Sequence, residues 1–432
     1  MEKLSRYNPL NYPVKILQFG EGNFLRAFVD WMIEELNQKA DFAAAVAIVQ
    51  PRGNAKYELI NQQNGVYHVI TRGIANGVKI DKIQRINCVK KCLNPQLHWP
   101  EIEKIALTRK LRFVFSNTTE AGIVFAANAD TFPAKLAKLL TLRANAGLPG
   151  LIFMPCELIE NNGSQLQECI IKYLNDPKVI EYVKKQCIFC NTLVDRIVAG
   201  FPESDAPYYW QKIGFRDDLL VSCEPFHFLA IENGESIKSE FPVEKCGLNV
   251  VFTDNLPMYR TRKVRFLNGA HTASVLGASL DGLQTVEDVT NHPKWSKFLN
   301  TILFDEIAPT VKLPEAEKIT YAKSILERFA NPYAKHQLHS IALNSVAKFQ
   351  VRVLPTILDY WRQSGSLPEN LTHSLGYLIN YYRTMEINDT EEVKKIFSSR
   401  PSVEEILGRT ELWGCNLNAI PGFTAKVQEV IK

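Results

Sequence analysis

Short apolar runs alternate with helical patterns through the first half of the chain, and this alternation constrains the fold more than any other feature. Four of the runs predict buried strands, at Val14–Phe19, Ala44–Val49, Leu111–Phe115 and Gly150–Met154. Three segments with apolar residues at helical spacing predict helices, at Phe24–Leu36, Pro133–Ala144 and Ser164–Leu174. Because parallel strands of one sheet need crossover connections, this order predicts an α/β domain built on a parallel sheet.

The second half of the chain has a different pattern. From Tyr259 to Lys432 helical periodicity dominates, and prolines interrupt it at Pro293, Pro309, Pro314, Pro332 and Pro355. A chain of 432 residues is long enough for two or three domains. We therefore predict an α/β domain over residues 1–245 and a mostly α-helical domain over residues 246–432.

The composition is that of a soluble globular protein, with 46% hydrophobic and 22% charged residues. The 50 basic residues nearly balance the 46 acidic ones, which argues against a nucleic-acid partner. The most basic stretch, Lys79–Lys91, alternates apolar and polar residues and predicts one strand with a solvated face. There is no signal-peptide pattern at the N-terminus and no apolar stretch of membrane-spanning length, so we expect a cytoplasmic protein without a membrane partner.

Nine cysteines are scattered without regular spacing, and an odd number argues against a secreted disulfide framework. Cys187 and Cys190 have the C-x-x-C spacing of redox or zinc sites, but no second pair lies nearby. We therefore expect buried thiols and predict no metal site.

A strand, a glycine turn and a helix follow one another from Val14 to Phe28. Gly20 can form a tight turn after the strand, and Gly22 lets the backbone approach a pyrophosphate. The free N–H groups and partial positive charge of the helix start then face that anion. The third glycine of G-x-G-x-x-G is replaced by Leu25, and glycine turns after strands are common. The position at the first strand–helix junction nevertheless favours a Rossmann-type dinucleotide site.

The acidic residue that usually binds the ribose at the end of the second strand is absent. The sequence there is Val49-Gln50-Pro51-Arg52. Arg52 could accept a 2′-phosphate and favour NADP, or it could be an ordinary surface arginine. The local sequence leaves the choice between NAD and NADP open.

The helical segment that begins at Arg262 carries a candidate catalytic group. In an α-helix of about 100° per residue, Asn268 lies about 140° and His271 about 80° around from Lys263, so the three can share one broad face. Carbonyl reduction needs a proton donor and dipoles that stabilise the developing alkoxide. A desolvated lysine can be the acid in reduction and the base in oxidation, while Asn and His bind the same oxygen. From these residues alone, the pattern favours an ordinary core or surface histidine, which is the more frequent role of a single helix histidine.

A second cluster contains Arg328, Lys335, His336 and Lys348, around a helix start at Asn331-Pro332. These cations could bind a carboxylate, but the local sequence favours a solvated helix face.

Together these segments resemble the mannitol dehydrogenase family, the long-chain polyol-specific dehydrogenases. The most specific match is K-x-x-x-x-N-x-x-H, which Lys263, Asn268 and His271 satisfy. Further matches follow in order along nearly the whole chain: Gly20-x-Gly22-x-Phe24, Gln63–Tyr67, Thr119-Glu120-x-Gly122, Val194–Ile197, Cys223–Phe226 and Asn331-Pro332.

The resemblance implies an NAD-binding Rossmann-type domain, a helical C-terminal domain and an active site between them. It implies Lys263 as general acid and base, Asn268 and His271 as groups that polarise the substrate oxygen, and no catalytic zinc. It also implies that Asp195 and Lys348 lie near the substrate. The residues implied in nucleotide binding are Phe19, Gly20, Gly22, Asn23, Phe24, Thr119 and Glu120.

Within the family, four segments are most similar to the branch that interconverts tagaturonate and altronate: Phe19–Trp31, Phe113–Gly122, Pro155–Ile159 and Lys335–Leu338. Leu158, Ser340 and Leu343 stand where the polyol enzymes carry polar residues, which argues against a mannitol-like substrate. A sugar-acid carboxylate needs cations, which Lys335, Arg328 or Lys348 could supply.

Two other activities are weighed against this assignment. One is a fructuronate reductase or mannitol-type dehydrogenase. The other is a catalytically silent dinucleotide sensor, against which the complete set of Lys263, Asn268 and His271 argues. The sequence does not predict the oligomeric state.

Overall fold

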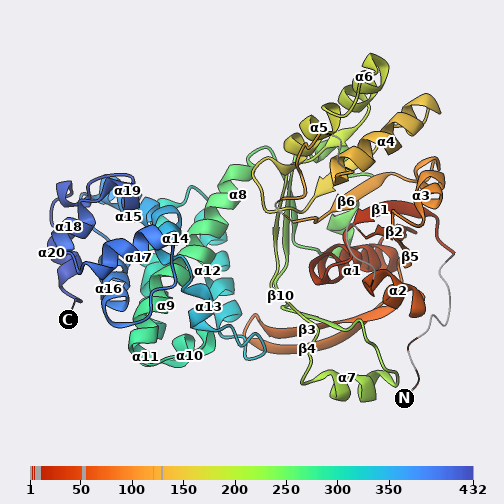
Figure 1. Ribbon diagram of the computed structural model, residues 1–432. Coiled ribbons are helices and arrows are strands. Elements are labelled where there is room, and N and C mark those ends of the chain that lie inside the picture. Colours follow the sequence, from red (N-terminus) through yellow and green to blue (C-terminus); the bar gives the residue numbers. More distant parts are fainter. Residues whose placement is uncertain are drawn as a thin grey trace. The chain divides into compact units, whose positions relative to one another are not determined.

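The computed structural model describes residues 2, 4, 11–50, 55–119, 121–127 and 130–431. The chain divides into two compact units (Figure 1). Unit 1 comprises Met1–Arg72 and Ile80–Leu256, and unit 2 comprises Gly73–Lys79 and Pro257–Lys432.

Unit 1 is built on a six-stranded sheet in which every neighbouring pair of strands is parallel. The strand order is β5-β2-β1-β6-β7-β8. The order reverses between β1 and β6, as in a doubly wound dinucleotide-binding fold, so the predicted Rossmann-type domain is confirmed. The strands are β1 Val14–Phe19, β2 Ala45–Val49, β5 Val89–Leu93, β6 Phe113–Ser116, β7 Ile152–Pro155 and β8 Ile188–Phe189.

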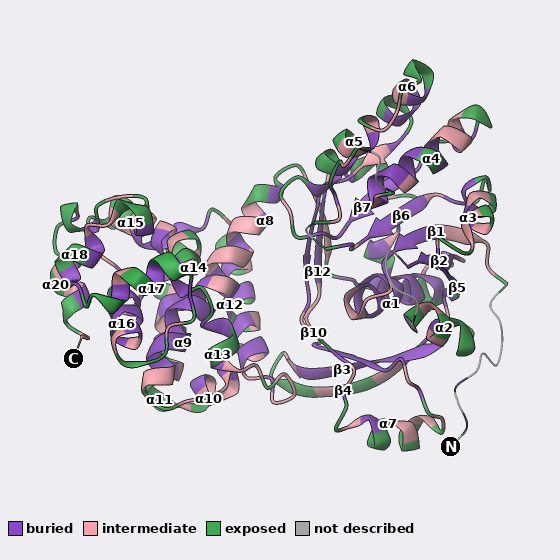
Figure 2. Cartoon of the chain, viewed as in Figure 1, coloured by how far each residue is buried: buried purple, intermediate pink, exposed green. Residues whose placement is uncertain are grey.

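Helices cover both faces of this sheet because successive strand residues point to opposite sides. In β1, Ile16 belongs to the core that includes helix α1, whereas Leu17 belongs to the core under α3 to α6. β2 is buried along its whole length, which explains its continuous apolar sequence (Figure 2). The helices of unit 1 are α1 Asn23–Lys39, α2 Ala55–Gln62, α3 Trp99–Ala106, α4 Phe132–Asn145, α5 Asn162–Ile171, α6 Pro177–Lys185 and α7 Ala206–Ile213, with 3₁₀ turns η1 Glu235–Ile237 and η2 Val243–Cys246.

Two smaller sheets lie mostly in unit 1, in the orders β10-β11-β3-β4 and β13-β12-β9, and the turn between β3 and β4 with the adjoining strand ends, Gly73–Lys79, belongs to unit 2. Their strands are β3 Tyr67–Ala75, β4 Val78–Ile86, β9 Thr192–Asp195, β10 Val198–Gly200, β11 Val221–Cys223, β12 Phe228–Glu232 and β13 Val250–Thr253.

The single strand predicted over Lys79–Lys91 is wrong, because the segment contributes to two sheets. Its first part is β4, an edge strand of the four-stranded sheet, and its last part lies in β5 of the six-stranded sheet. The backbone N–H groups of Asn87 and Cys88 both donate to the buried Glu34 carboxylate, at 2.8 and 3.0 Å. This carboxylate from α1 fixes the backbone between the two strands, which the local alternation could not reveal.

Unit 2 is mostly helical, as predicted. Its helices are α8 Leu256–Arg262, α9 Ala270–Leu280, α10 Val286–Asn291, α11 Pro293–Thr301, α12 Glu315–Phe329, α13 Leu338–Ile341, α14 Ser345–Arg352, α15 Leu354–Ser364, α16 Glu369–Thr384, α17 Glu391–Ser398, α18 Val403–Leu407, α19 Thr410–Trp413 and α20 Phe423–Gln428. Two π-helical segments, η3 Lys263–Gly269 and η4 Ile302–Ile307, and two 3₁₀ turns, η5 Ala308–Thr310 and η6 Leu417–Ala419, lie among them.

Helix α9 lies in the interior of unit 2 and packs closely against its neighbours. A methyl group added to Gly277 would overlap the ring of the fully buried Trp295 on α11. Across the part of the chain that the structure describes, no helix combines the length and apolar character needed to cross a bilayer.

Candidate functional site

The glycine turn after β1 has a backbone that only glycine adopts without strain. Gly20 has φ +129°, and its N–H donates to the Val49 carbonyl of β2 at 3.1 Å. A Cβ atom at this position would lie 2.9 Å from Leu25 Cδ1 and 3.1 Å from the Asn117 carbonyl oxygen. Gly20 therefore links the carboxyl ends of β1 and β2 and packs against the loop after β6.

The N-terminus of α1 opens immediately beyond this turn. Gly22 is the N-cap, with φ −64° and ψ 162°, and no side chain caps the helix. A Cβ atom on Gly22 would meet nothing within 4 Å, and the first helical turn carries no acidic residue. Asn23 accepts a 2.6 Å hydrogen bond from Arg26, and Phe24 stacks on Phe28. No side chain therefore caps the first-turn N–H groups of α1, and such a helix start suits a pyrophosphate.

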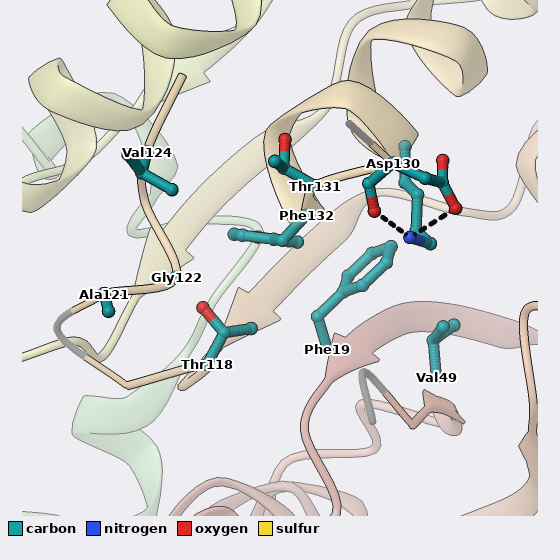
Figure 3. Close-up of a pocket in the computed structure, with 10 residues that line it drawn as sticks. Phe19, Val49, Thr118, Ala121, Gly122, Val124, Asp130, Thr131 and Phe132 are labelled. Atoms are coloured by element: carbon teal, nitrogen blue, oxygen red, sulfur yellow. Dashed lines mark hydrogen bonds and ion pairs between the residues drawn. The ribbon is translucent and has the colours of Figure 1, made fainter. Parts of the chain in front are cut away.

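A cavity of about 250 Å³ lies beside the turn, at the carboxyl ends of the parallel strands (Figure 3). Phe19 at the end of β1 and Phe132 at the start of α4 form one wall, with ring centroids 4.9 Å apart. At the rim, the Lys135 ammonium pairs with Asp130 at 2.7 Å. The complete lining is Phe19, Val49, Thr118, Ala121, Gly122, Val124, Asp130, Thr131, Phe132 and Lys135.

This cavity lies where the strand order reverses, which is where doubly wound folds bind nucleotides. Its apolar walls suit a planar base, and the adjacent helix start suits the phosphates. The residues present therefore fit a dinucleotide.

A buried carboxylate that the sequence analysis did not identify holds the loop after β6. Glu157 accepts hydrogen bonds from the Ser116 hydroxyl at 2.9 Å and from the Thr118 N–H and hydroxyl at 2.9 and 3.0 Å. Burial raises the pKa of Glu157. The pairing of β6 with β7 brings these residues together, and no local pattern marks them. Thr119, which follows, is exposed and has φ +77°, whereas Arg52 and Glu120 lie outside the described residues.

In unit 2, the lysine and asparagine of the predicted catalytic group lie on a π-helix. The α-helical geometry expected for Lys263 to Asn268 is wrong, because η3 extends from Lys263 to Gly269 before α9 begins. A π-helix bonds residue i to residue i+5, so Asn268 lies roughly one turn from Lys263. The π segment thus aligns the two side chains more closely than an α-helix would.

His271 lies in the first turn of α9 and is held in a ring cluster. The residue is 8% exposed, and its imidazole stacks on Phe329 with centroids 4.0 Å apart and meets the edge of His336 at 5.4 Å. Burial and then the positive fields of His336, Arg328 and Arg352 lower the pKa of His271 well below its usual value. The ring is therefore neutral at physiological pH.

Two of the three candidate side chains have unused hydrogen-bonding capacity. Among the described residues, none hydrogen-bonds to the Asn268 amide or to the His271 imidazole, whose Nε2 is fully buried. Lys263 is half-buried and interacts within the protein. A buried polar atom without a partner is costly, so its presence indicates a position that a ligand can satisfy.

The predicted substrate residues occupy different environments. Asp195 is buried at the end of β9 in unit 1. Lys335 is exposed in unit 2, with φ +35°. Lys348 on α14 is half-buried, and its ammonium donates to the Ile341 carbonyl at 2.8 Å. Burial and the charge of Arg352 lower the pKa of Lys348. The structure thus adds Arg352, four residues after Lys348, which the sequence analysis did not consider.

The two cysteines with C-x-x-C spacing lie in an environment typical of structural thiols. Cys187 and Cys190 are buried and unbonded to each other, and burial raises their pKa values to about 11 and about 12. Within the described ranges, no group of three His, Cys, Asp or Glu side chains is placed to hold a metal ion.

Comparison with known proteins finds relatives along nearly the whole chain. Residues 14–245 match the family domain described as mannitol dehydrogenase Rossmann domain, and residues 255–432 match the mannitol dehydrogenase C-terminal domain. Altronate oxidoreductase of Bacillus subtilis is 40% identical over 96% of this chain and 92% of its own length. The protein of the same name from Bacteroides thetaiotaomicron is 38% identical over 96% and 93%.

Two solved structures share the fold. D-sorbitol dehydrogenase in substrate-free form has a TM-score of 0.85 at 20% identity, covering 98% of this chain and 94% of that one. Pseudomonas fluorescens mannitol 2-dehydrogenase, in a ternary complex with NAD and D-mannitol, has a TM-score of 0.70 at 19% identity, covering 99% and 93%.

Proposed function

This chain belongs to the mannitol dehydrogenase family, as its sequence indicated, and on that premise we propose that it is an NAD-dependent oxidoreductase that interconverts tagaturonate and altronate. The observation that carries the substrate assignment is the match to altronate oxidoreductases at 35–40% identity over at least 92% of their length. The reaction is a reversible reduction of the substrate's ketone to a secondary alcohol.

The nucleotide assignment rests on the glycine turn, the uncapped start of α1 and the cavity at the strand reversal. Phe19, Gly20, Gly22, Asn23 and Phe24 are the proposed contacts of the dinucleotide within the described residues, with Thr119 from the loop after β6. Arg52 and Glu120 are proposed contacts from outside the described residues. The bound dinucleotide would supply the hydride for reduction as NADH and would accept it in oxidation as NAD⁺.

In the proposed reduction, Lys263 transfers a proton to the ketone oxygen as the carbon receives the hydride. In oxidation, the amine removes the same proton from the hydroxyl. The Asn268 amide donates to this oxygen, and the neutral His271 ring offers an N–H with no other partner, so both stabilise the developing alkoxide. An ammonium and two neutral donors supply the polarisation, so the proposed reaction needs no metal. We propose that Asp195, Lys335 and Lys348 contact the substrate.

An absorbance assay at the NADH band tests the reaction. Tagaturonate, fructuronate and fructose are each supplied with NADH, and we expect the highest kcat/KM for tagaturonate. Higher efficiency with fructuronate or fructose reassigns the substrate, and NADH binding without turnover on any of them favours a silent sensor.

The proton-transfer role is tested with Lys263→Ala. We expect kcat to fall by at least about 10²-fold, the usual size of a general acid–base contribution, with thermal unfolding unchanged. Lys297→Ala is the matched control, because Lys297 is an exposed lysine of the same unit. Equal turnover in the two variants would remove Lys263 from the mechanism.

A further inference from the structure

Arg352, the last residue of α14, is a half-buried cation with no counter-ion among the residues that the structure describes. No described residue forms an ion pair or a hydrogen bond with its guanidinium. Burial lowers the pKa of Arg352, which reflects the cost of removing the charge from water. Because buried charges in proteins are normally paired, this position suits an anion from outside the chain.

A second cation stands beside it. Lys348 is four residues earlier on α14, so the two side chains share one face of the helix. The Lys348 ammonium uses one of its three N–H groups on the Ile341 carbonyl, which leaves two for a ligand. The nearby carboxylate, Asp389, already accepts hydrogen bonds from the Tyr382 hydroxyl at 2.7 Å and from the backbone N–H groups of Val346 and Thr390 at 3.2 and 2.8 Å.

These cations lie close to the segment that carries the catalytic group. A Cβ atom on Gly269 would lie 3.1 Å from the Arg352 carbonyl oxygen, so the end of α14 packs directly against the residue after Asn268. Arg352 is also one of the charges that act on the His271 ring. A small ligand with its reacting carbon at Asn268 and His271 therefore has a pair of cations nearby in the same unit.

We propose that the guanidinium of Arg352 and the ammonium of Lys348 bind the substrate's carboxylate and so select sugar acids over uncharged sugars. This inference rests on the proposed function, which it extends by naming the specificity-determining residue. A planar guanidinium can bind both carboxylate oxygens, whereas a polyol hydroxyl would leave the charge unpaired. Of the other cations, Lys335 is exposed, and Arg328 is buried with interactions inside the protein.

The test compares steady-state kinetics of Arg352→Gln and Lys348→Met on tagaturonate and on fructose, both with NADH. Hydrogen bonds to charged groups contribute about 1.5–3 kcal/mol, so we expect Arg352→Gln to lower kcat/KM for tagaturonate by about 10- to 150-fold, mainly through KM. The efficiency with fructose should change less than about threefold, since no carboxylate is involved. Arg352→Lys should show a smaller loss than Arg352→Gln, because lysine keeps the positive charge but lacks the planar guanidinium that binds both carboxylate oxygens.

Arg362→Gln is the matched control, because Arg362 is exposed and pairs with Asp359 on the surface of the same unit. NADH titration and thermal unfolding confirm that each variant is folded. Equal losses on tagaturonate and fructose, or no loss in Arg352→Gln, would overturn the assignment while the proposed function stands. If instead the wild type reduces fructose but no ketouronate, the proposed function itself fails. Kinetics of the wild type alone distinguish this outcome from a failure of the Arg352 assignment.

Discussion

Replacing Gly20 by alanine should destabilise unit 1, whereas replacing Gly22 by alanine should weaken NADH binding with little effect on stability. At Gly20, φ +129° is strained for any residue with a Cβ atom, and the methyl group would press on Leu25 and the Asn117 carbonyl. Such strain costs about 1–3 kcal/mol, and loss of the bond to Val49 adds about 1 kcal/mol. For a domain of this size we expect the melting temperature to fall by roughly 4–15 °C.

At Gly22 the same change meets a different environment. The backbone at φ −64° and ψ 162° is open to every residue, and nothing lies within 4 Å of the added methyl. Alanine is a poorer N-cap than glycine but restricts the unfolded chain, so the net effect on stability stays within about 1 kcal/mol. The methyl instead occupies the space in front of α1. Loss of one hydrogen bond to a charged phosphate should raise the Kd of NADH about tenfold or more.

Thermal unfolding followed by circular dichroism and NADH titration followed by fluorescence separate the two effects. Gly147→Ala is the control, since Gly147 has φ +62° with open space around it, away from the nucleotide turn. It should lose about 1 kcal/mol of stability and keep the wild-type Kd for NADH. Wild-type NADH affinity in Gly22→Ala would refute the assigned position of the pyrophosphate. Wild-type melting in Gly20→Ala would refute the steric argument for the turn.

Three further predictions concern pH, packing and metal dependence. Burial raises the pKa of Asp30 to about 7. The Tyr67 hydroxyl has a single hydrogen, which faces both the Asp30 carboxyl group and the Arg26 carbonyl. The folded chain therefore keeps the Asp30 proton up to about pH 7, whereas the unfolded chain loses it above about pH 4. Between about pH 4 and 7 this group should therefore lower the wild-type free energy of unfolding by about 1.4 kcal/mol per pH unit. In urea unfolding, the stability of Asp30→Asn relative to the wild type should rise with pH over that range. A difference between the two proteins that does not depend on pH contradicts this prediction. Gly277→Ala should lower the stability of unit 2 by about 1–3 kcal/mol, because the added methyl group overlaps the Trp295 ring. Unchanged thermal unfolding would show that α9 and α11 can move apart to accommodate the methyl group. Dialysis against a chelator should leave NADH-dependent turnover intact, and a loss restored by added metal would establish a metal requirement.

The sequence was sufficient to predict features that depend on a few consecutive residues. Parallel strands buried on both faces require continuous apolar runs such as Ala45–Val49, and their order with intervening helices predicted the parallel sheet. The turn at Gly20 was predictable because a sharp bend after a strand requires a residue without a Cβ atom. The spacing of Lys263, Asn268 and His271 named a candidate catalytic group, and family membership was evident from its motifs.

Tertiary contacts decided what those patterns left open. The division of Lys79–Lys91 between two sheets depends on Glu34, more than forty residues away in sequence. The loop after β6 depends on Glu157, which follows the neighbouring strand β7. The π-helical turn that aligns Lys263 with Asn268 arises in a buried segment packed against α14, and helical periodicity does not distinguish it from an α-helix. The sequence does not distinguish Arg352 from any other helix arginine, and only the fold shows that it is half-buried without a counter-ion among the described residues. Local sequence determines backbone preference and side-chain chemistry, whereas burial and pairing depend on residues that only the folded chain brings together.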